Sequence, residues 1–418
     1  MEKFIVKGGN RLEGEVSISG AKNAVVGLIP ATVLAGDTCI IENLPHIADV
    51  LHLSEILNNM GIKSEFIDKH TLKVESGMKP HSDPQYDLVN KIRASYYFIG
   101  ALLAKYKRAE VALPGGCNFG GRPIDQHIKG FEALGAKVVI EHGVVKASAD
   151  KLIGANIYMD VVSVGATINV MLAATMAEGT TVIENAAREP HVVDVANFLN
   201  SIGANIKGAG TDEIKIEGVS ELGGSTYAAI PDQIEAGTYM VAAAMTEGDV
   251  TIKNVIPKHL ESITSKLREM GVSVEEAGDS VRVYGERPYK AINVKTLPYP
   301  GFPTDMQPQM LTLLSTAEGN SIVRESVFDN RFQYLTELIR FGANVSAEGK
   351  VAVVNGTTDL TGAEVKCTDL RGGVSMILMG LNSKGETKVS DIRHVDRGYE
   401  NIVSKLRGLG ADITRIEE

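Results

Sequence analysis

Tryptophan is absent from this chain of 418 residues, and only 10 phenylalanines and 12 tyrosines are present. Aromatic platforms on which nucleic-acid bases stack are therefore not expected. Basic residues are also in short supply, because 42 Lys and Arg face 52 Asp and Glu, for a formal net charge of −10. A nucleic-acid-binding protein usually has a basic surplus. Both shortages argue against a nucleic-acid partner.

Cysteines are few, and long apolar runs are missing. Cys39, Cys117 and Cys367 lie far apart without a CxxC pair, which excludes a disulfide framework or a zinc site and fits a reducing compartment. No run reaches the ~18 apolar residues of a membrane span, and the N-terminus lacks the apolar core of a secretion signal. We expect a cytoplasmic protein without a membrane partner.

What the chain does have is an internal repeat. A helical stretch that ends in apolar-Gly-apolar recurs six times, at Gly61, Gly135, Gly203, Gly271, Gly342 and Gly410. A second marker, a small-residue turn before a β-rich segment, keeps the same period at Gly36, Gly179, Gly248, Gly319 and Gly385. The sequence thus predicts six units of about 70 residues. The junction glycine suits a left-handed position after the helix.

Each unit reads as a hairpin, an apolar helix, a strand and an amphipathic helix, which is an α/β pattern. One predicted hairpin joins 214–216 to 226–228. The first helices, such as 168–176 and 374–381, are apolar nearly all round and must be buried on every side. One unit cannot bury such a helix alone, so several must pack together. The period allows three plus three units or two plus four.

Basic residues recur where helices are predicted to begin. Asp49, Ser163, Asp232 and Asp369 at such places are explained by capping. Basic side chains oppose the helix dipole unless an anion lies between them and the free N–H groups. The sequence therefore predicts a cleft for anionic small molecules, with structural ion pairs as the alternative. The basic residues concerned are Lys22, Arg93, Arg122, Arg188, Lys258, Arg331 and Arg397.

The most unusual segment is LPGGCNFGGRPIDQH, residues 113–127. It is not a Walker loop, because Gly121-Arg122 stands where Lys-Ser/Thr is required. Cys117 has glycines and an arginine around it before a predicted helix, a setting that lowers a thiol pKa and raises reactivity. Cys39 and Cys367 lie in apolar strands and are expected to be buried and inert.

Four motifs together resemble one family. They are PGGCNFGGRPID, the early GAKN at 20–23, YPGFPTDMQ at 299–307 and DNRF at 329–332. The chain resembles the UDP-N-acetylglucosamine enolpyruvyl transferases over its whole length. The resemblance implies two inside-out α/β barrels of three repeats each, with the active site in a cleft between them. It places residues 20–230 in one domain and residues 1–19 plus 231–418 in the other.

The resemblance also implies roles for individual residues. Phosphoenolpyruvate is assigned to Lys22, Asn23, Arg122 and Arg397, with Cys117, Asp305, Lys22 and Arg397 as the catalytic group. The UDP-sugar and the surrounding cleft are assigned to Arg93, Arg122, Pro123, Ile124, Asp125, Gln126, Val162, Ser163, Val164, Gly165, Asp305, Val327, Arg331, Asp369 and Arg371. Neither a cofactor nor a metal is implied. Cys117 is implied as a proton donor that can carry covalent adducts, including one from fosfomycin, and a role in product release stays open.

The reaction implied is transfer of the enolpyruvyl group of phosphoenolpyruvate to the 3′-hydroxyl of UDP-N-acetylglucosamine, the first committed step of peptidoglycan synthesis. Adding an alcohol to the enol phosphate of phosphoenolpyruvate needs an acid at C3, a base at the hydroxyl and an anion clamp. Asp305 is the candidate base, and the basic residues form the clamp. Two alternatives remain: a 3-phosphoshikimate enolpyruvyl transferase of the same fold, and a non-catalytic protein that binds nucleotide sugars.

Overall fold

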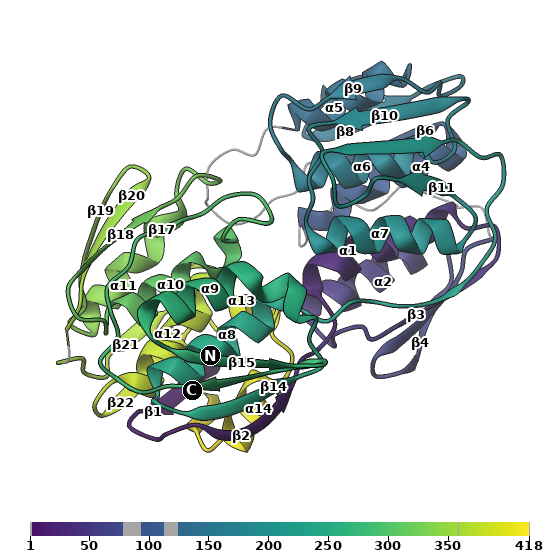
Figure 1. Ribbon diagram of the computed structural model, residues 1–418. Coiled ribbons are helices and arrows are strands. Elements are labelled where there is room, and N and C mark those ends of the chain that lie inside the picture. The colour runs from purple at the N-terminus through teal and green to yellow at the C-terminus, as the bar shows by residue number, and fades with distance from the viewer. Residues whose placement is uncertain (1, 78–92, 113–123, 358, 418) are drawn as a thin grey trace. The chain divides into compact units, whose positions relative to one another are not determined.

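The computed structural model describes residues 2–77, 93–112, 124–357 and 359–417 (Figure 1). The described chain divides into two compact units. The first unit comprises the described residues from 20 to 230, and the second comprises the described residues from 2 to 19 and from 231 to 417. Cys117, Arg122 and Pro123, which are predicted site residues, lie outside the described residues.

The described strands of the first unit form three sheets. One has the order β13-β3-β5-β4, with β13 Thr226–Ala228, β3 Thr38–Glu42, β5 Thr71–Glu75 and β4 Ser64–Asp68. The next is β6-β8-β7, with β6 Arg108–Ala112, β8 Val144–Ser148 and β7 Lys137–Glu141. The last is β11-β12-β10-β9, with β11 Asn205–Lys207, β12 Glu213–Glu217, β10 Thr180–Glu184 and β9 Asn156–Tyr158.

The described strands of the second unit form three four-stranded sheets, two of which include N-terminal strands. The first is β15-β16-β14-β2, with β15 Ser273–Ala277, β16 Ser280–Tyr284, β14 Asp249–Lys253 and β2 Glu13–Ser17. The second is β17-β18-β20-β19, with β17 Val294–Lys295, β18 Asn320–Arg324, β20 Val351–Asn355 and β19 Asn344–Glu348. The third is β21-β22-β1-β23, with β21 Glu364–Lys366, β22 Glu386–Ser390, β1 Glu2–Lys7 and β23 Asp412–Glu417.

One strand pairing differs from the prediction. Residues 226–228 were expected to form a hairpin with 214–216, but β12 pairs with β11 and β10, and β13 pairs in parallel with β3. This is the general pattern, because five of the six described sheets contain one parallel pair of strands. The pairs are β13 with β3, β9 with β10, β2 with β14, β17 with β18 and β21 with β22. The short polar segment 218–225 reads as a hairpin turn from local sequence, whereas the parallel pairing depends on a strand some 180 residues away.

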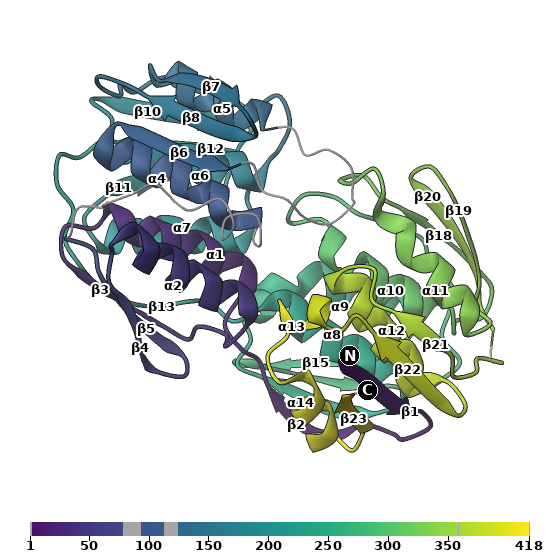
Figure 2. The ribbon, with the colours of Figure 1, turned by 180° about the vertical axis from the view of Figure 1, so that it is seen from behind.

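The apolar helices occupy the interior of each unit, as predicted. In the first unit they are α1 Lys22–Ala31, α4 Tyr97–Tyr106 and α6 Val164–Ala174, and in the second α8 Gln233–Met245, α10 Gln307–Leu314 and α12 Leu370–Asn382. α4 contacts α1 and α6, while α8, α10 and α12 contact one another. Every residue of α8 from Ile234 to Met245 is buried. Figure 2 shows the sheets around these helices from behind.

Each amphipathic second helix contacts the strand that follows it, and five short 3₁₀ segments of the described chain precede or follow helices. The second helices are α2 Ala48–Met60, α5 Asp125–Ala133, α7 Pro190–Ser201, α9 Glu261–Met270, α11 Leu335–Arg340 and α14 Ile402–Gly408, with the short α13 Arg393–Asp396 before the last. The 3₁₀ segments are η1 Thr32–Leu34, η2 Arg93–Tyr96, η3 Pro257–Leu260, η4 Thr304–Met306 and η5 Arg331–Tyr334.

The predicted left-handed junctions are confirmed. All six junction glycines have φ between 90° and 112°. An L side chain would be strained there, which explains why glycine closes every second helix. In the described residues, no helix is both long enough and apolar enough to span a membrane.

Candidate active site

In the second unit, four of the predicted site residues form a cluster of alternating charge. Asp305 lies in η4, Arg331 begins η5, and Asp369 and Arg371 lie at the start of α12. Asp305 Oδ2 is 3.1 Å from Arg371 Nη2, and Asp305 Oδ1 is 3.6 Å from Arg331 Nη2. Both arginine side chains are 3% exposed, whereas the Asp305 side chain is 27% exposed. Two buried cations therefore hold one carboxylate that still reaches solvent.

Arg371 contacts an aromatic ring as well as Asp305. Its guanidinium carbon lies 5.4 Å from the centre of the Tyr399 ring. Burial lowers the pKa of Arg371, but the interactions with Tyr399 and with the Asp305 carboxylate outweigh this effect, so the pKa is raised above its ordinary value. Arg371 Nη1 is buried and has no hydrogen-bond partner among the described residues. Arg371 is thus a permanent cation with donor capacity to spare beside Asp305.

Asp369 has a structural role in this cluster. Its carboxylate accepts hydrogen bonds from the backbone N–H groups of Arg371, at 2.9 Å, and Gly372, at 3.1 Å. These bonds cap α12, and the same oxygen is 3.9 Å from Arg331 Nη1. Asp232 caps α8 in the same way through Ile234 and Glu235. The capping explanation of these two residues is confirmed, and substrate contact by Asp369 stays a prediction.

Glu325 joins two predicted site loops and was missed by the sequence analysis. This buried carboxylate accepts hydrogen bonds from the Thr304 hydroxyl at 3.0 Å and the Val327 N–H at 2.8 Å. It therefore ties the residue before Asp305 to the exposed Val327. A signal existed in the repeat, because four of the five equivalent positions hold Asn or Asp, at Asn43, Asn185, Asn254 and Asp391, each with φ of 55° or 56°.

Exchange of Glu325 for Gln is expected to lower turnover about tenfold with a smaller effect on global stability. The amide keeps the shape but replaces one accepting oxygen by a donor, so it faces a backbone N–H or a hydroxyl unfavourably. Steady-state kinetics and thermal unfolding of the variant measure both effects. The exposed Glu348, on β19, changed to Gln, is the matched control. Unchanged turnover in the Glu325 variant would contradict a positioning role.

Arg397 lies at a different place from the one predicted. It was expected at a helix N-terminus, but it is the C-cap of α13, and α14 begins five residues later. Several other basic residues near helix starts are paired locally, with Arg188 3.2 Å from Asp212 and Lys258 2.7 Å from Glu261. For these two the ion-pair alternative is sufficient. The helix-dipole argument for an anion was wrong for Arg397, because the dipole favours a cation at the C-terminal end of a helix. Only the folded chain shows where α13 ends.

In the first unit, Lys22 and Asn23 open α1. Lys22 Nζ is 3.3 Å from Asp49 Oδ2 in the first turn of α2, and the Asp49 side chain is 2% exposed. The N-cap of α1 is Ala21, which provides no side-chain acceptor. Positive charge from Lys22 and the N–H groups of α1 therefore lie together, and Asp49 fixes the ammonium group.

Two stretches predicted to hold the UDP-sugar are joined by hydrogen bonds. Gln126, in the first turn of α5, donates to Asp160 Oδ2 at 3.0 Å and accepts from the Asp160 N–H at 2.9 Å. This places Ile124 and Asp125 beside the segment that leads to Val162 and Val164. Ser163 caps α6 by accepting from the Ala166 N–H at 3.2 Å. Gly165 needs to be small, since a Cβ would lie 2.8 Å from the Tyr96 hydroxyl oxygen.

The buried His127 supports the segments 124–126 and 162–165. It was not singled out by the sequence analysis. Burial lowers the pKa of His127 to about 4. Asn169 Nδ2 lies 3.0 Å from His127 Nδ1, which assigns Nδ1 as an acceptor and the proton of the neutral ring to Nε2. Asn169 also accepts from the Gly100 N–H and donates to the Tyr96 carbonyl. His127 thereby connects α5 with α4 and α6.

The stability of the protein is expected to fall by about 2 kcal/mol between pH 7 and pH 5 through His127. Its folded pKa of about 4 is below the ordinary 6.5, so its contribution is complete above pH 6.5 and is lost as the pH falls toward 4. Chemical denaturation of the wild type and His127→Gln at both pH values measures the difference. The exposed His142, changed to Gln, is the control. An equal pH dependence in all three proteins would contradict the prediction.

Two cysteines are buried, as predicted. Cys39 lies in β3 and Cys367 follows β21, and they are 0% and 2% exposed. Burial raises the pKa of both thiols.

Arg93, another predicted site residue, lies at the start of η2.

Comparison with known proteins decides the family. The family model described as EPSP synthase (3-phosphoshikimate 1-carboxyvinyltransferase) matches residues 6–406. The chain belongs to this family. Within it, the chain is 59% identical over 417 residues to UDP-N-acetylglucosamine 1-carboxyvinyltransferase of Clostridium botulinum, covering 100% of both chains. A relative of that name, numbered 3, from Caldanaerobacter subterraneus subsp. tengcongensis is 58% identical, again over 100% of both chains.

Two solved structures have the same fold as this chain. The enolpyruvyl transferase NikO from Streptomyces tendae is matched with a TM-score of 0.90 at 26% identity, over 99% of this chain and 98% of that one. EPSP synthase from Acinetobacter baumannii is matched with a TM-score of 0.79 at 20% identity over the full length of both, which shows the fold alone. The predicted fold class and family resemblance are confirmed. The described sheets of each unit remain separate and do not join into one closed barrel.

Proposed function

We propose that this protein transfers the enolpyruvyl group of phosphoenolpyruvate to the 3′-hydroxyl of UDP-N-acetylglucosamine and releases phosphate, as an early step of peptidoglycan synthesis. The observation that carries the proposal is the 59% identity, over the full length of both chains, to a protein of that name. We also infer a cytoplasmic location, because both substrates are cytoplasmic metabolites. Neither a metal nor a cofactor is part of the proposal.

The proposed chemistry is an addition followed by an elimination. The sugar oxygen forms a bond to C2 of phosphoenolpyruvate, its proton leaves to a base, and C3 gains a proton, which gives a tetrahedral phospholactoyl intermediate. C3 then loses a proton, the C2–O bond to phosphate breaks, and the enol ether remains. The net change exchanges the hydroxyl proton for the enolpyruvyl group. Acid, base and anion stabilisation are all needed.

The geometry in the second unit supports Asp305 as the base. Its carboxylate is held by Arg371 and Arg331 from the buried side and is open to solvent on the other. A base must be oriented and still reach the hydroxyl proton. Arg371 and Arg331 are then positioning residues for Asp305, and their charge also attracts the anionic substrates.

The anion clamp is proposed to contain Lys22 and Asn23 from the first unit and Arg397 from the second, together with Arg122. Lys22 and the N–H groups at the start of α1 provide positive charge for a phosphate or carboxylate. Cys117 is proposed as the acid at C3. The sugar nucleotide is assigned to Arg93, Pro123, the segments 124–126 and 162–165, and to Val327.

The experiment is phosphate release from phosphoenolpyruvate with UDP-N-acetylglucosamine, with 3-phosphoshikimate, or with no acceptor. We expect rapid phosphate release only when UDP-N-acetylglucosamine is the acceptor. Release with 3-phosphoshikimate, after which the matching family is named, would instead assign that acceptor. Binding of UDP-N-acetylglucosamine without phosphate release from the intact protein would point to the non-catalytic alternative.

A further inference from the structure

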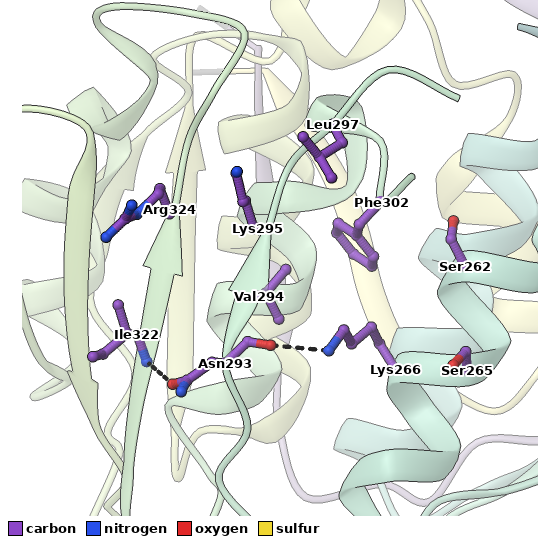
Figure 3. Close-up of a pocket in the computed structure, with 10 residues that line it drawn as sticks. All are labelled: Ser262, Ser265, Lys266, Asn293, Val294, Lys295, Leu297, Phe302, Ile322 and Arg324. Atoms are coloured by element: carbon purple, nitrogen blue, oxygen red, sulfur yellow. Dashed lines mark hydrogen bonds between the residues drawn. The ribbon is translucent and has the colours of Figure 1, made fainter. Parts of the chain in front are cut away.

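A cavity of about 540 Å³ lies in the second unit, and none of the residues assigned to the substrates lines it. Figure 3 shows Ser262, Ser265 and Lys266 of α9 on one side, and residues of β17 and β18 on the other. The apolar part of its lining includes Phe302 and the partly exposed Leu297 and Ile322. Binding sites for small organic molecules usually have volumes of about 300–1,000 Å³ and combine apolar walls with a few polar groups.

Three cations line this cavity, although the protein as a whole carries a charge of −10. Lys266 is compensated, since its Nζ donates to Glu269 at 2.7 Å and to the Asn293 carbonyl at 3.0 Å. Lys295 and Arg324 form no ion pair with another described residue. They are also directly opposite each other in the parallel register of β17 and β18. Like charges at opposed positions destabilise a sheet.

The repeats show that the fold does not require this pair. In each of the other parallel strand pairs, the two residues that face each other at the end of the strands include at most one charged residue. These pairs are Ser17 with Lys253, Lys366 with Ser390, Ala228 with Glu42, and Tyr158 with Glu184. Among the five parallel pairs of the described chain, only Lys295 and Arg324 combine two cations. The excess positive charge is therefore local to the cavity.

We propose that this cavity binds a small organic oxyanion, a phosphate or carboxylate with a compact apolar body. Lys295 and Arg324 would share the anionic group, which relieves their mutual repulsion. The ring of Phe302, with Leu297 and Ile322, would cover the apolar body. None of the residues assigned to the two substrates lines the cavity, so this site is additional to the proposed active site and does not depend on the proposed reaction.

The lining is connected to the loop that carries Asp305. Phe302 pairs with Thr296 in an isolated bridge, and the Leu297 N–H donates to the Phe302 carbonyl at 3.0 Å. Thr296 in turn donates to Glu325, which also accepts from Thr304. A ligand on Phe302 would thus contact the same loop that positions Asp305.

The test uses the full chain with labelled isoleucine methyl groups and follows the Ile322 methyl resonance by NMR. The probe is 1-naphthyl phosphate, compared with 1-naphthoate, neutral 1-naphthol and inorganic phosphate. We expect a saturable shift with the naphthyl phosphate, at least ~10-fold weaker binding of inorganic phosphate and of naphthol, and a tenfold or greater loss in Lys295→Ala and Arg324→Ala. Saturable binding of naphthoate as well would assign oxyanions in general, and its absence would assign phosphates.

Lys366→Ala is the matched control, because Lys366 occupies the equivalent strand position of the next repeat opposite an uncharged serine. Its affinity for the probe should equal that of the wild type. Without probe, Lys295→Ala should melt at the same or a higher temperature, since a repulsion is removed. The proposal is overturned by an Ile322 methyl that does not respond to millimolar probe, by equal affinity in all variants, or by a shift that follows protein concentration in parallel with dimerisation in sedimentation velocity.

Discussion

Asp305→Asn is expected to lower turnover ~100-fold or more, while binding of UDP-N-acetylglucosamine changes far less. The amide has nearly the same shape but cannot accept the proton of the sugar hydroxyl. It also removes the negative charge between Arg371 and Arg331, which lie 3.1 and 3.6 Å from the carboxylate. Steady-state phosphate release and calorimetric binding of the sugar nucleotide separate the two effects.

Thermal unfolding distinguishes lost chemistry from lost structure in this variant. Asp329, whose side chain is 75% exposed and paired with Lys350, provides Asp329→Asn as a matched control that should turn over normally. Near-normal turnover of Asp305→Asn would show that another residue acts as the base. Asp369 would be the next candidate by sequence, but its carboxylate is buried and caps α12, so Asp369→Asn should show its main effect in unfolding.

Selective alkylation of Cys117 is the second result with a large expected effect. An epoxide that carries a phosphonate, such as fosfomycin, should be opened by this thiolate, with the epoxide oxygen taking up a proton and a thioether forming. The reaction should be faster with UDP-N-acetylglucosamine bound, because the sugar nucleotide and the epoxide are proposed to occupy adjacent positions of one active site. Intact mass followed by peptide mapping should find one adduct, and Cys117→Ala should abolish it.

Cys39 and Cys367 serve as internal controls for this experiment. Both are buried, and burial raises both thiol pKa values, so neither should react at a comparable rate. Labelling of either at the rate of Cys117, or a rate that ignores the sugar nucleotide, would contradict the prediction. Cys117→Ser should leave a much weaker nucleophile and no measurable adduct.

Much of the fold could be predicted because its signals are local. A helix that is apolar all round must be buried, and a glycine after an amphipathic helix predicts a left-handed end, as found at Gly61 and Gly271. The buried state of Cys39 and Cys367 followed in the same way from apolar neighbours. Strand pairing was less accessible, because β13 joins β3 across most of the first unit and no local pattern specifies that partner.

The supporting residues of the candidate site could not be found in the same way. Glu325 and His127 act through hydrogen bonds to segments on other elements, and single positions carry no sign of such partners. Glu325 could have been noticed as a departure from the Asn or Asp that four of the other repeats have at this position. The pairing of Lys22 with Asp49 likewise depends on how α1 and α2 pack.

By itself, the sequence determined the six repeats, the α/β class, the buried helices, the glycine junctions and, through four motifs, the family. Each depends on residue types and spacings along the chain. Only the tertiary structure decided that Arg331 and Arg371 converge on Asp305, that Arg397 ends α13, and that Lys295 faces Arg324. The physical reason is that charge–charge interactions and hydrogen bonds act over a few ångströms in space, and residues far apart in the chain reach such distances only after the apolar helices have packed.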